Sequence, residues 1–178
     1  MSKIKNLKPN LSGPHLQGYF KPTNPHKYRG NINEIIFRSS WEQRFMVWCD
    51  IHPNIKCWAN ETVAIPYYNT CTKYSKETGR FLGSWNNYYI DFFIQIEKNG
   101  VLESWLIEVK PNMQIPTTEQ IAKLQKMINE GNMTAKKMNR YNYQLKTLLV
   151  NRSKFLAAKK FAEERGCKFA IVDENFLF

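Results

Sequence analysis

The chain has 178 residues, enough for one domain with a substantial hydrophobic core. Hydrophobic residues make up 43% and aromatic residues 14% of it, which excludes an intrinsically disordered chain. The 26 Lys and Arg outnumber the 15 Asp and Glu, which gives a net charge of +11. This charge favours a polyanionic partner, with nucleic acid as the first candidate. A role in solubility or an anionic protein partner would also account for it.

Three kinds of segment are missing from the sequence. No run of about 18 apolar residues occurs, so we expect neither a membrane-spanning helix nor a membrane partner. Residues 1–17 carry lysines but no continuous apolar stretch, which argues against a secretory signal. The four cysteines are scattered without a CxxC pair, a pattern that predicts reduced thiols and disfavours a zinc site.

The N-terminal residues 1–31 are rich in Pro, Asn, Gly and Lys and predict an irregular basic arm. The remainder, 32–178, is expected to form one domain. That domain begins with a short strand at 34–37 and a helix at 40–50, which the turn sequence IHPN ends.

The rest of the domain changes between strand and helix patterns. Strands are expected at 55–58, 62–66, 88–97, 102–109 and 168–172, and helices at 118–129, 134–150 and 151–165. The basic and aromatic stretch 69–87 predicts a loop or hairpin that turns at 77–79, and Gly166 is placed to cap the last helix. This order predicts an α/β fold, a small mixed sheet with one helix before it and several after it.

Two neighbouring strands carry charged side chains on one face. In YYIDFFIQIE, apolar residues alternate along one face, and Asp91 lies mid-strand on the other, where Asp is disfavoured. In SWLIEVKPN, apolar residues alternate with Glu108 and Lys110. If the strands pair through the turn KNG between them, their apolar faces align, and the three charged residues share the opposite face.

Two carboxylates held close together repel each other unless a cation lies between them. Mg²⁺ suits such a pair, because it needs only one or two protein carboxylates and takes water and phosphate oxygens as its other ligands. A bound metal polarises a phosphate and lowers the pKa of its water, while Lys110 could position or deprotonate that water or stabilise developing charge. The alternative is an exposed strand pair in which Lys110 and Glu108 form a surface salt bridge.

Three further polar residues are candidates for the same site, each with a structural alternative. Glu42 borders the buried face of the first helix, but Ser39 and Glu42 also have the spacing of a capping box. Asn151 and Lys154 are three residues apart and share a helix face, which could face a phosphate or lie in solvent.

Four segments in this order carry a family resemblance. They are FRSSWEQRFMVWCDIHPNIKCWANETVAIPY, YYIDFFI, WLIEVKP and NRSKFLAAKKFAEERGCKFAIVDE, which together cover roughly residues 32–175. They resemble the head completion nucleases of T-even-type tailed phages, within the PD-(D/E)XK nuclease superfamily, with the TnsA-type transposition endonucleases as more distant relatives. One departure is Ile90, which stands where the superfamily commonly has proline before the aspartate.

The resemblance implies a restriction-endonuclease-like αβββαβ core and a site built around Mg²⁺, for which Mn²⁺ would substitute. Asp91 and Glu108 would be metal ligands, Glu42 would hold the metal or its water, and Lys110 would be the catalytic lysine. The residues implied near the phosphate or DNA are Asn151 and Lys154.

The function implied is a DNA endonuclease that acts on double-stranded DNA late in phage head assembly, after packaging and before tail attachment. Such a protein would work in the cytoplasm of the bacterial host or in the virion head, beside portal, neck or head proteins. Two alternatives stay open: a non-catalytic DNA-binding or structural head protein on a nuclease scaffold, and a nuclease specific for branched DNA.

Overall fold

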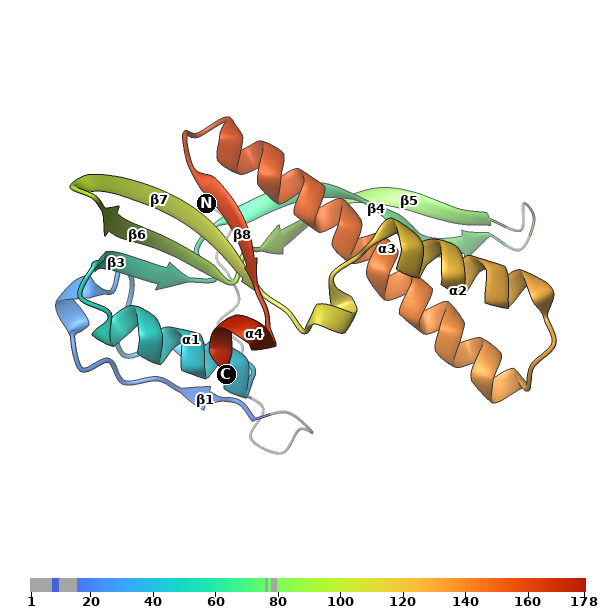
Figure 1. The fold of residues 1–178 in the computed structure, drawn as a ribbon, viewed down its shortest axis with the longest axis horizontal. Coiled ribbons are helices and arrows are strands. Elements are labelled where there is room, and N and C mark those ends of the chain that lie inside the picture. Colours follow the sequence, from blue (N-terminus) through green and yellow to red (C-terminus); the bar gives the residue numbers. More distant parts are fainter. Residues whose placement is uncertain (1–7, 10–15, 76, 78–79) are drawn as a thin grey trace.

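In a computed structural model of the chain, which describes residues 8–9, 16–75, 77 and 80–178, a four-stranded mixed sheet forms the centre of the protein (Figure 1). Its strands lie in the order β3 (Ile55–Asn60), β6 (Phe92–Lys98), β7 (Val101–Val109) and β8 (Lys168–Val172). The first three are antiparallel neighbours, and β8 runs parallel to β7. The predicted α/β fold with a small mixed sheet is confirmed.

The hairpin of β6 and β7 has the register expected from the sequence. Asn99 and Gly100 adopt φ angles of 53° and 77°, the left-handed conformation of the tight turns that match strand twist. Phe92 pairs with Ile107, and the same register continued one residue outward sets Asp91 opposite Glu108. The turn chemistry therefore decides which side chains meet at the open end of the hairpin.

Helix α1 (Ser40–Ile51) covers one face of the sheet. Phe45 and Met46 are buried there against the apolar face of β6, with the Phe45 and Phe92 rings 4.8 Å apart. The described part of the N-terminal arm also packs on this side, because the buried Tyr28 ring lies 4.7 Å from that of Trp58. The arm predicted to be irregular thus contributes to the core.

Helix α3 (Ala135–Glu163) covers the other face and runs without a break. Ala158 and Ala162 are almost completely buried and let the helix approach the sheet closely. The separate helices predicted at 134–150 and 151–165 are therefore wrong, because nothing at the junction breaks the pattern of backbone hydrogen bonds. The predicted cap is confirmed: Gly166 has φ 64°, and the Cys167 N–H donates to the Ala162 carbonyl.

The strand predicted at 88–97 is in fact parts of two strands in different sheets. The chain leaves β5 (Arg80–Tyr89) and starts β6 only at Phe92. Between them the Ile90 N–H donates to the Val63 carbonyl, and the Asp91 carbonyl accepts from the Glu61 N–H. These bonds to residues 61–63, which follow β3, end the first ladder, so the backbone turns where Asp91 lies.

A separate two-stranded ribbon is formed by β4 (Ala64–Ser75) and β5. The strand predicted at 62–66 is the start of β4, and of the loop or hairpin predicted at 69–87 the hairpin is confirmed, with longer strands than expected. The turn predicted at 77–79 lies partly outside the described residues. One face of the ribbon, including the buried Ile65, Tyr67 and Tyr88, packs against α3.

Smaller elements complete the fold. They are β1 (Gly18–Tyr19), η1 (Pro25–Lys27), β2 (Ile36–Phe37), η2 (Asn112–Gln114), α2 (Thr118–Glu130) and α4 (Glu174–Leu177). Helix α2 begins with a complete capping box between Thr117 and Gln120 and packs against the first half of α3. Within the described residues, none of the helices is both long and apolar enough to cross a bilayer.

Candidate active site

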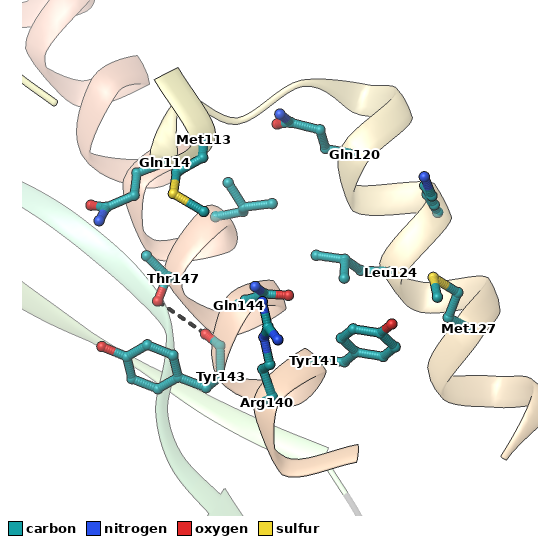
Figure 2. A pocket seen from close by; sticks show the side chains of 12 residues that line it. Met113, Gln114, Gln120, Leu124, Met127, Arg140, Tyr141, Tyr143, Gln144 and Thr147 are labelled. Atoms are coloured by element: carbon teal, nitrogen blue, oxygen red, sulfur yellow. Dashed lines mark hydrogen bonds between the residues drawn. The ribbon is translucent and has the colours of Figure 1, made fainter. Parts of the chain in front are cut away.

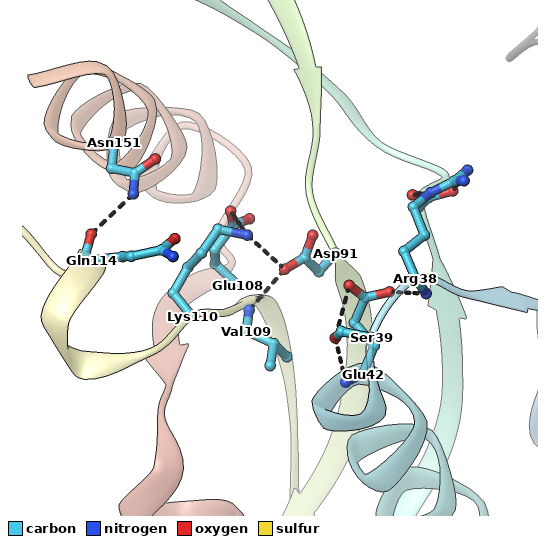
Figure 3. Close-up of polar contacts among 10 residues, drawn as sticks. Arg38, Ser39, Glu42, Asp91, Glu108, Val109, Lys110, Gln114 and Asn151 are labelled. Carbon is cyan, nitrogen blue, oxygen red and sulfur yellow. Dashed lines mark hydrogen bonds and ion pairs between the residues drawn. The ribbon is translucent and has the colours of Figure 1, made fainter. Parts of the chain in front are cut away.

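Asp91, Glu108 and Lys110 meet at the end of the β6–β7 hairpin (Figure 3). The Lys110 Nζ lies 3.1 Å from Glu108 Oε1 and 3.6 Å from Asp91 Oδ2. The Val109 N–H donates to Asp91 Oδ2 over 2.8 Å, which ties the aspartate to the neighbouring strand. The face that the three residues were predicted to share is the one that α3 covers. The Glu108 side chain is only 2% exposed, so the alternative of an exposed strand pair does not hold for this residue.

Burial makes this cluster electrostatically costly. The pKa of Glu108 is raised to about 7 by burial first and by the charge of Asp91 second, while Lys110 opposes both. Burial likewise raises the pKa of Asp91, against the opposing charge of Lys110. For Lys110 burial favours the neutral amine, but the two carboxylates outweigh it and raise the pKa, so the lysine is an ammonium at neutral pH.

Glu42 borders the cluster from the opposite layer of the fold. Ser39 caps α1, because its hydroxyl accepts from the Glu42 N–H, and Glu42 Oε2 accepts the Arg38 N–H over 2.8 Å. The capping-box interpretation is therefore correct in part. Ser39 accepts from the Glu42 N–H, but the Glu42 carboxylate accepts from the Arg38 N–H, whereas in a complete capping box it would accept from the Ser39 N–H. Glu42 lines the same hollow as Lys110, so it faces the same site. Burial and then the charge of Asp91 raise the pKa of Glu42 to about 7.

A hollow of about 600 Å³ opens at Glu42 and Lys110. Among the residues that line it are Arg38, Glu42, Lys110 and Gln114, which come from the start of α1, the end of β7 and η2. A phosphate that entered the hollow would therefore meet the ammonium of Lys110 and the carboxylate of Glu42 together.

An ion pair that the sequence did not predict joins the layers of the site. The Arg38 guanidinium donates to both carboxylate oxygens of Glu61, over 2.6 and 2.8 Å. Glu61 has a φ of 49°, and its N–H donates to the Asp91 carbonyl. The pair thus connects the residue beside Glu42 to the backbone of Asp91. No local sequence signal marks it, since its two members are 23 residues apart.

The two residues predicted to lie near the phosphate are placed differently. Asn151 is buried, and its amide donates to the Gln114 carbonyl over 2.9 Å, so this side chain anchors η2 to α3 (Figure 3). Lys154 is half-buried, with its Nζ 5.3 Å from the centre of the Tyr88 ring. Burial lowers the pKa of Lys154, and Glu108 opposes this effect. Of the two residues, only Lys154 carries a charge, and its ammonium lies over the Tyr67 and Tyr88 rings.

The donor set fits Mg²⁺ better than a metal that needs a full protein cage. Within the described part of the chain, no three His, Cys, Asp or Glu side chains form a ready-made metal site. Mg²⁺ needs only one or two carboxylates, however, and keeps several waters. Glu108 Oε2 is buried without a hydrogen-bond partner, and a bound cation would satisfy it.

The fold has the element order α1, β3, β6, β7, α3 and β8, with the β4–β5 ribbon inserted after β3, and the carboxylates lie at the end of its central hairpin. This arrangement defines the restriction-endonuclease-like class of α/β domains. The sequence profile "TnsA-like endonuclease N terminal" matches residues 52–174, and the chain belongs to this family.

A curated relative agrees with this assignment. The chain is 31% identical to the "Head completion nuclease" of Enterobacteria phage T4 over 160 residues, which cover 90% of this chain and 92% of the relative. The comparison with solved structures gives no significant match. The family resemblance inferred from the four sequence segments is therefore confirmed.

Proposed function

We propose that the protein is a Mg²⁺-dependent DNA endonuclease that hydrolyses phosphodiester bonds, with Mn²⁺ able to replace Mg²⁺. The observation that carries this proposal is the convergence of Asp91, Glu108 and Lys110 at one strand end, with Glu42 of α1 lining the same hollow as Lys110 (Figure 3). Membership of an endonuclease family supports the same reaction class.

Each residue of the cluster has a distinct part in this chemistry. Asp91 and Glu108 would hold the metal, which when bound polarises a phosphate oxygen and acidifies a water. The Lys110 ammonium donates hydrogen bonds to a non-bridging phosphate oxygen or to the attacking water and favours negative charge there. Glu42, whose pKa of about 7 lies near neutral pH, can accept a proton from a water in the hollow.

The biological setting is proposed from the relative. The T4 protein is named for head completion, and the identity of 31% extends over nine-tenths of this chain. We infer that this protein acts on double-stranded DNA at the filled phage head, after packaging and before tail attachment, beside portal, neck or head proteins. The net charge of +11 supports contact with packaged DNA.

Nicking of supercoiled plasmid tests the proposed reaction. Wild-type protein is compared with Asp91→Asn and Lys110→Ala in Mg²⁺, in Mn²⁺ and in EDTA. The matched control is Lys56→Ala, which removes an exposed lysine that pairs with Glu97 on the same sheet, far along the strands from the cluster. We expect metal-dependent nicking by wild type and control, and its loss in both site variants with their circular dichroism unchanged.

A second candidate is a non-catalytic DNA-binding head protein. The observation that favours it is the ion pairing of Lys110 with both carboxylates, which partly neutralises the cluster without any metal. Equal nicking by all four proteins would identify a contaminant, and DNA binding without nicking in any metal would support this second candidate. Comparison of branched with linear DNA then separates a junction nuclease from a general one.

A further inference from the structure

A second hollow lies beside the candidate active site, between α2 and α3 (Figure 2). Its volume is about 580 Å³, and Gln114 lines both this groove and the active-site hollow. Helix η2, which ends at Gln114, is held in place by the Asn151 amide. The two hollows therefore adjoin each other along a backbone segment that is anchored to α3.

The floor of the groove is apolar and aromatic. Leu124 and Met127 of α2 are spaced for one helix face, and Leu124 and Tyr141 of α3 point toward each other across the gap (Figure 2). Met113, which also lines the groove, is 69% exposed. A hollow lined mainly by apolar and aromatic side chains is typical of a binding site.

The charged residues of the groove are all cationic. Lys123 and Arg140 line it from opposite helices, and no Asp or Glu is among the lining residues. The stretch 131–162, which contains most of α3, likewise has no acidic residue. Its basic residues are Lys136, Lys137, Arg140, Lys146, Arg152, Lys154, Lys159 and Lys160. An anionic occupant is therefore favoured.

An apolar floor between two cations suits an unpaired nucleic-acid strand better than a duplex. A duplex stacks its bases inside and presents phosphates to a protein, so it gains little from an aromatic floor. A single strand can place its bases on apolar and aromatic side chains while Lys and Arg contact its phosphates. A groove of this volume matches those that enclose drug-sized ligands, about one or two nucleotides.

We propose that the α2–α3 groove binds an unpaired DNA segment that leaves the candidate active site past Gln114. This inference rests on the proposed endonuclease function and adds a substrate class to it: duplex DNA with a single-stranded tail, flap or gap beside the scissile phosphate. The faces of the bases lie on Leu124, Met127 and Tyr141, and Lys123 and Arg140 contact the phosphates.

Binding in EDTA tests the groove without any cleavage. Fluorescence anisotropy compares a blunt duplex with the same duplex that carries a short single-stranded tail. The variant is Lys123→Ala/Arg140→Ala. The matched control is Lys126→Ala/Lys159→Ala, which removes two exposed cations from the same helices outside the groove. Circular dichroism and thermal unfolding check that both proteins are folded.

Wild type and control are expected to bind the tailed duplex several-fold more tightly than the blunt one. The groove variant should lose this preference while it keeps its affinity for the blunt duplex. For the tailed duplex, the slope of log affinity against log salt should fall in magnitude by about 1.4, since each single-strand phosphate contact contributes about 0.7. Emission from 2-aminopurine in the tail should be quenched by stacking in wild type and control but not in the groove variant.

Four results would overturn the inference. Equal affinity of wild type for both duplexes would show that the tail is not bound. Equal weakening of both duplexes by the groove variant, or equal loss in groove variant and control, would indicate general electrostatic attraction. Unchanged DNA binding in the groove variant would leave the groove to a polypeptide. Failure of the proposed nuclease reaction can be distinguished from failure of the groove inference. A protein that prefers the tailed duplex in EDTA but never nicks DNA would support the groove and contradict the nuclease reaction.

Discussion

Replacement of Glu108 by glutamine should stabilise the metal-free protein. The Glu108 carboxylate is 2% exposed, and one of its oxygens has no hydrogen-bond partner. A rise of its pKa from 4.5 to about 7 means that ionisation costs about 3 kcal/mol more in the folded protein than in the unfolded chain, since one pKa unit equals about 1.4 kcal/mol. Glutamine keeps the shape and an acceptor for Lys110 without that charge.

The effect depends on pH with a definite sign. Between the ordinary pKa of 4.5 and the folded value of about 7, the folded protein binds more protons at Glu108 than the unfolded chain does. The free energy of unfolding of the wild type therefore falls as the pH rises through this window. Glu108→Gln removes this part of the slope, so its advantage should be absent near pH 4 and approach about 3 kcal/mol near pH 8.

Urea unfolding in EDTA at several pH values measures the difference directly. Glu108 is not among the groups that shift the pKa of Glu42, so the contribution of Glu42 is expected to cancel in the comparison. The reasoning would be refuted by a variant that is less stable than wild type near pH 8, or by a difference in stability that does not change with pH. Either result would show that burial does not make ionisation of Glu108 unfavourable in the folded protein. The expected result would show that the candidate metal site reduces the stability of the metal-free protein.

Three further predictions concern the supports of the site. In a double-mutant cycle, Arg38→Ala and Glu61→Ala should show a coupling of about 1 kcal/mol in urea unfolding, because the bidentate pair is only partly screened; additive effects would contradict it. Ser39→Ala should cost about 1 kcal/mol through loss of the helix cap, and an unchanged unfolding midpoint would show that the cap is dispensable. Mg²⁺ at about 100 times its dissociation constant should stabilise wild type by about 2.7 kcal/mol and Asp91→Asn by far less; an equal shift in thermal unfolding would place the metal elsewhere.

The core elements were predictable where a local signal was unambiguous. The strand 168–172 agrees residue for residue with β8, and the helix expected at 40–50 is α1, whose start is marked by the Ser39 cap. The hairpin that brings Asp91 opposite Glu108 follows from two alternating strands and a turn whose residues tolerate positive φ. These signals act over a few residues and need no distant partner.

Other features depended on contacts that no short pattern encodes. Apolar alternation continues through Ile90, so the sequence could not show that residues 88–97 divide between two sheets; the bonds of Glu61 and Val63 decide it. The helix α3 was predicted as two helices that meet at 150 and 151, yet it is continuous there, and the Asn151 amide donates to the Gln114 carbonyl.

By itself, the sequence determined the alternation that puts Asp91, Glu108 and Lys110 on one strand face, and the excess of positive charge. Only the tertiary structure decided that this face is buried under α3, that Arg38 joins Glu61 across the site, and that α2 and α3 leave a groove beside it. The physical reason is that strand period and turn chemistry are local, whereas burial, pKa and the pairing of charges depend on which distant segments pack together.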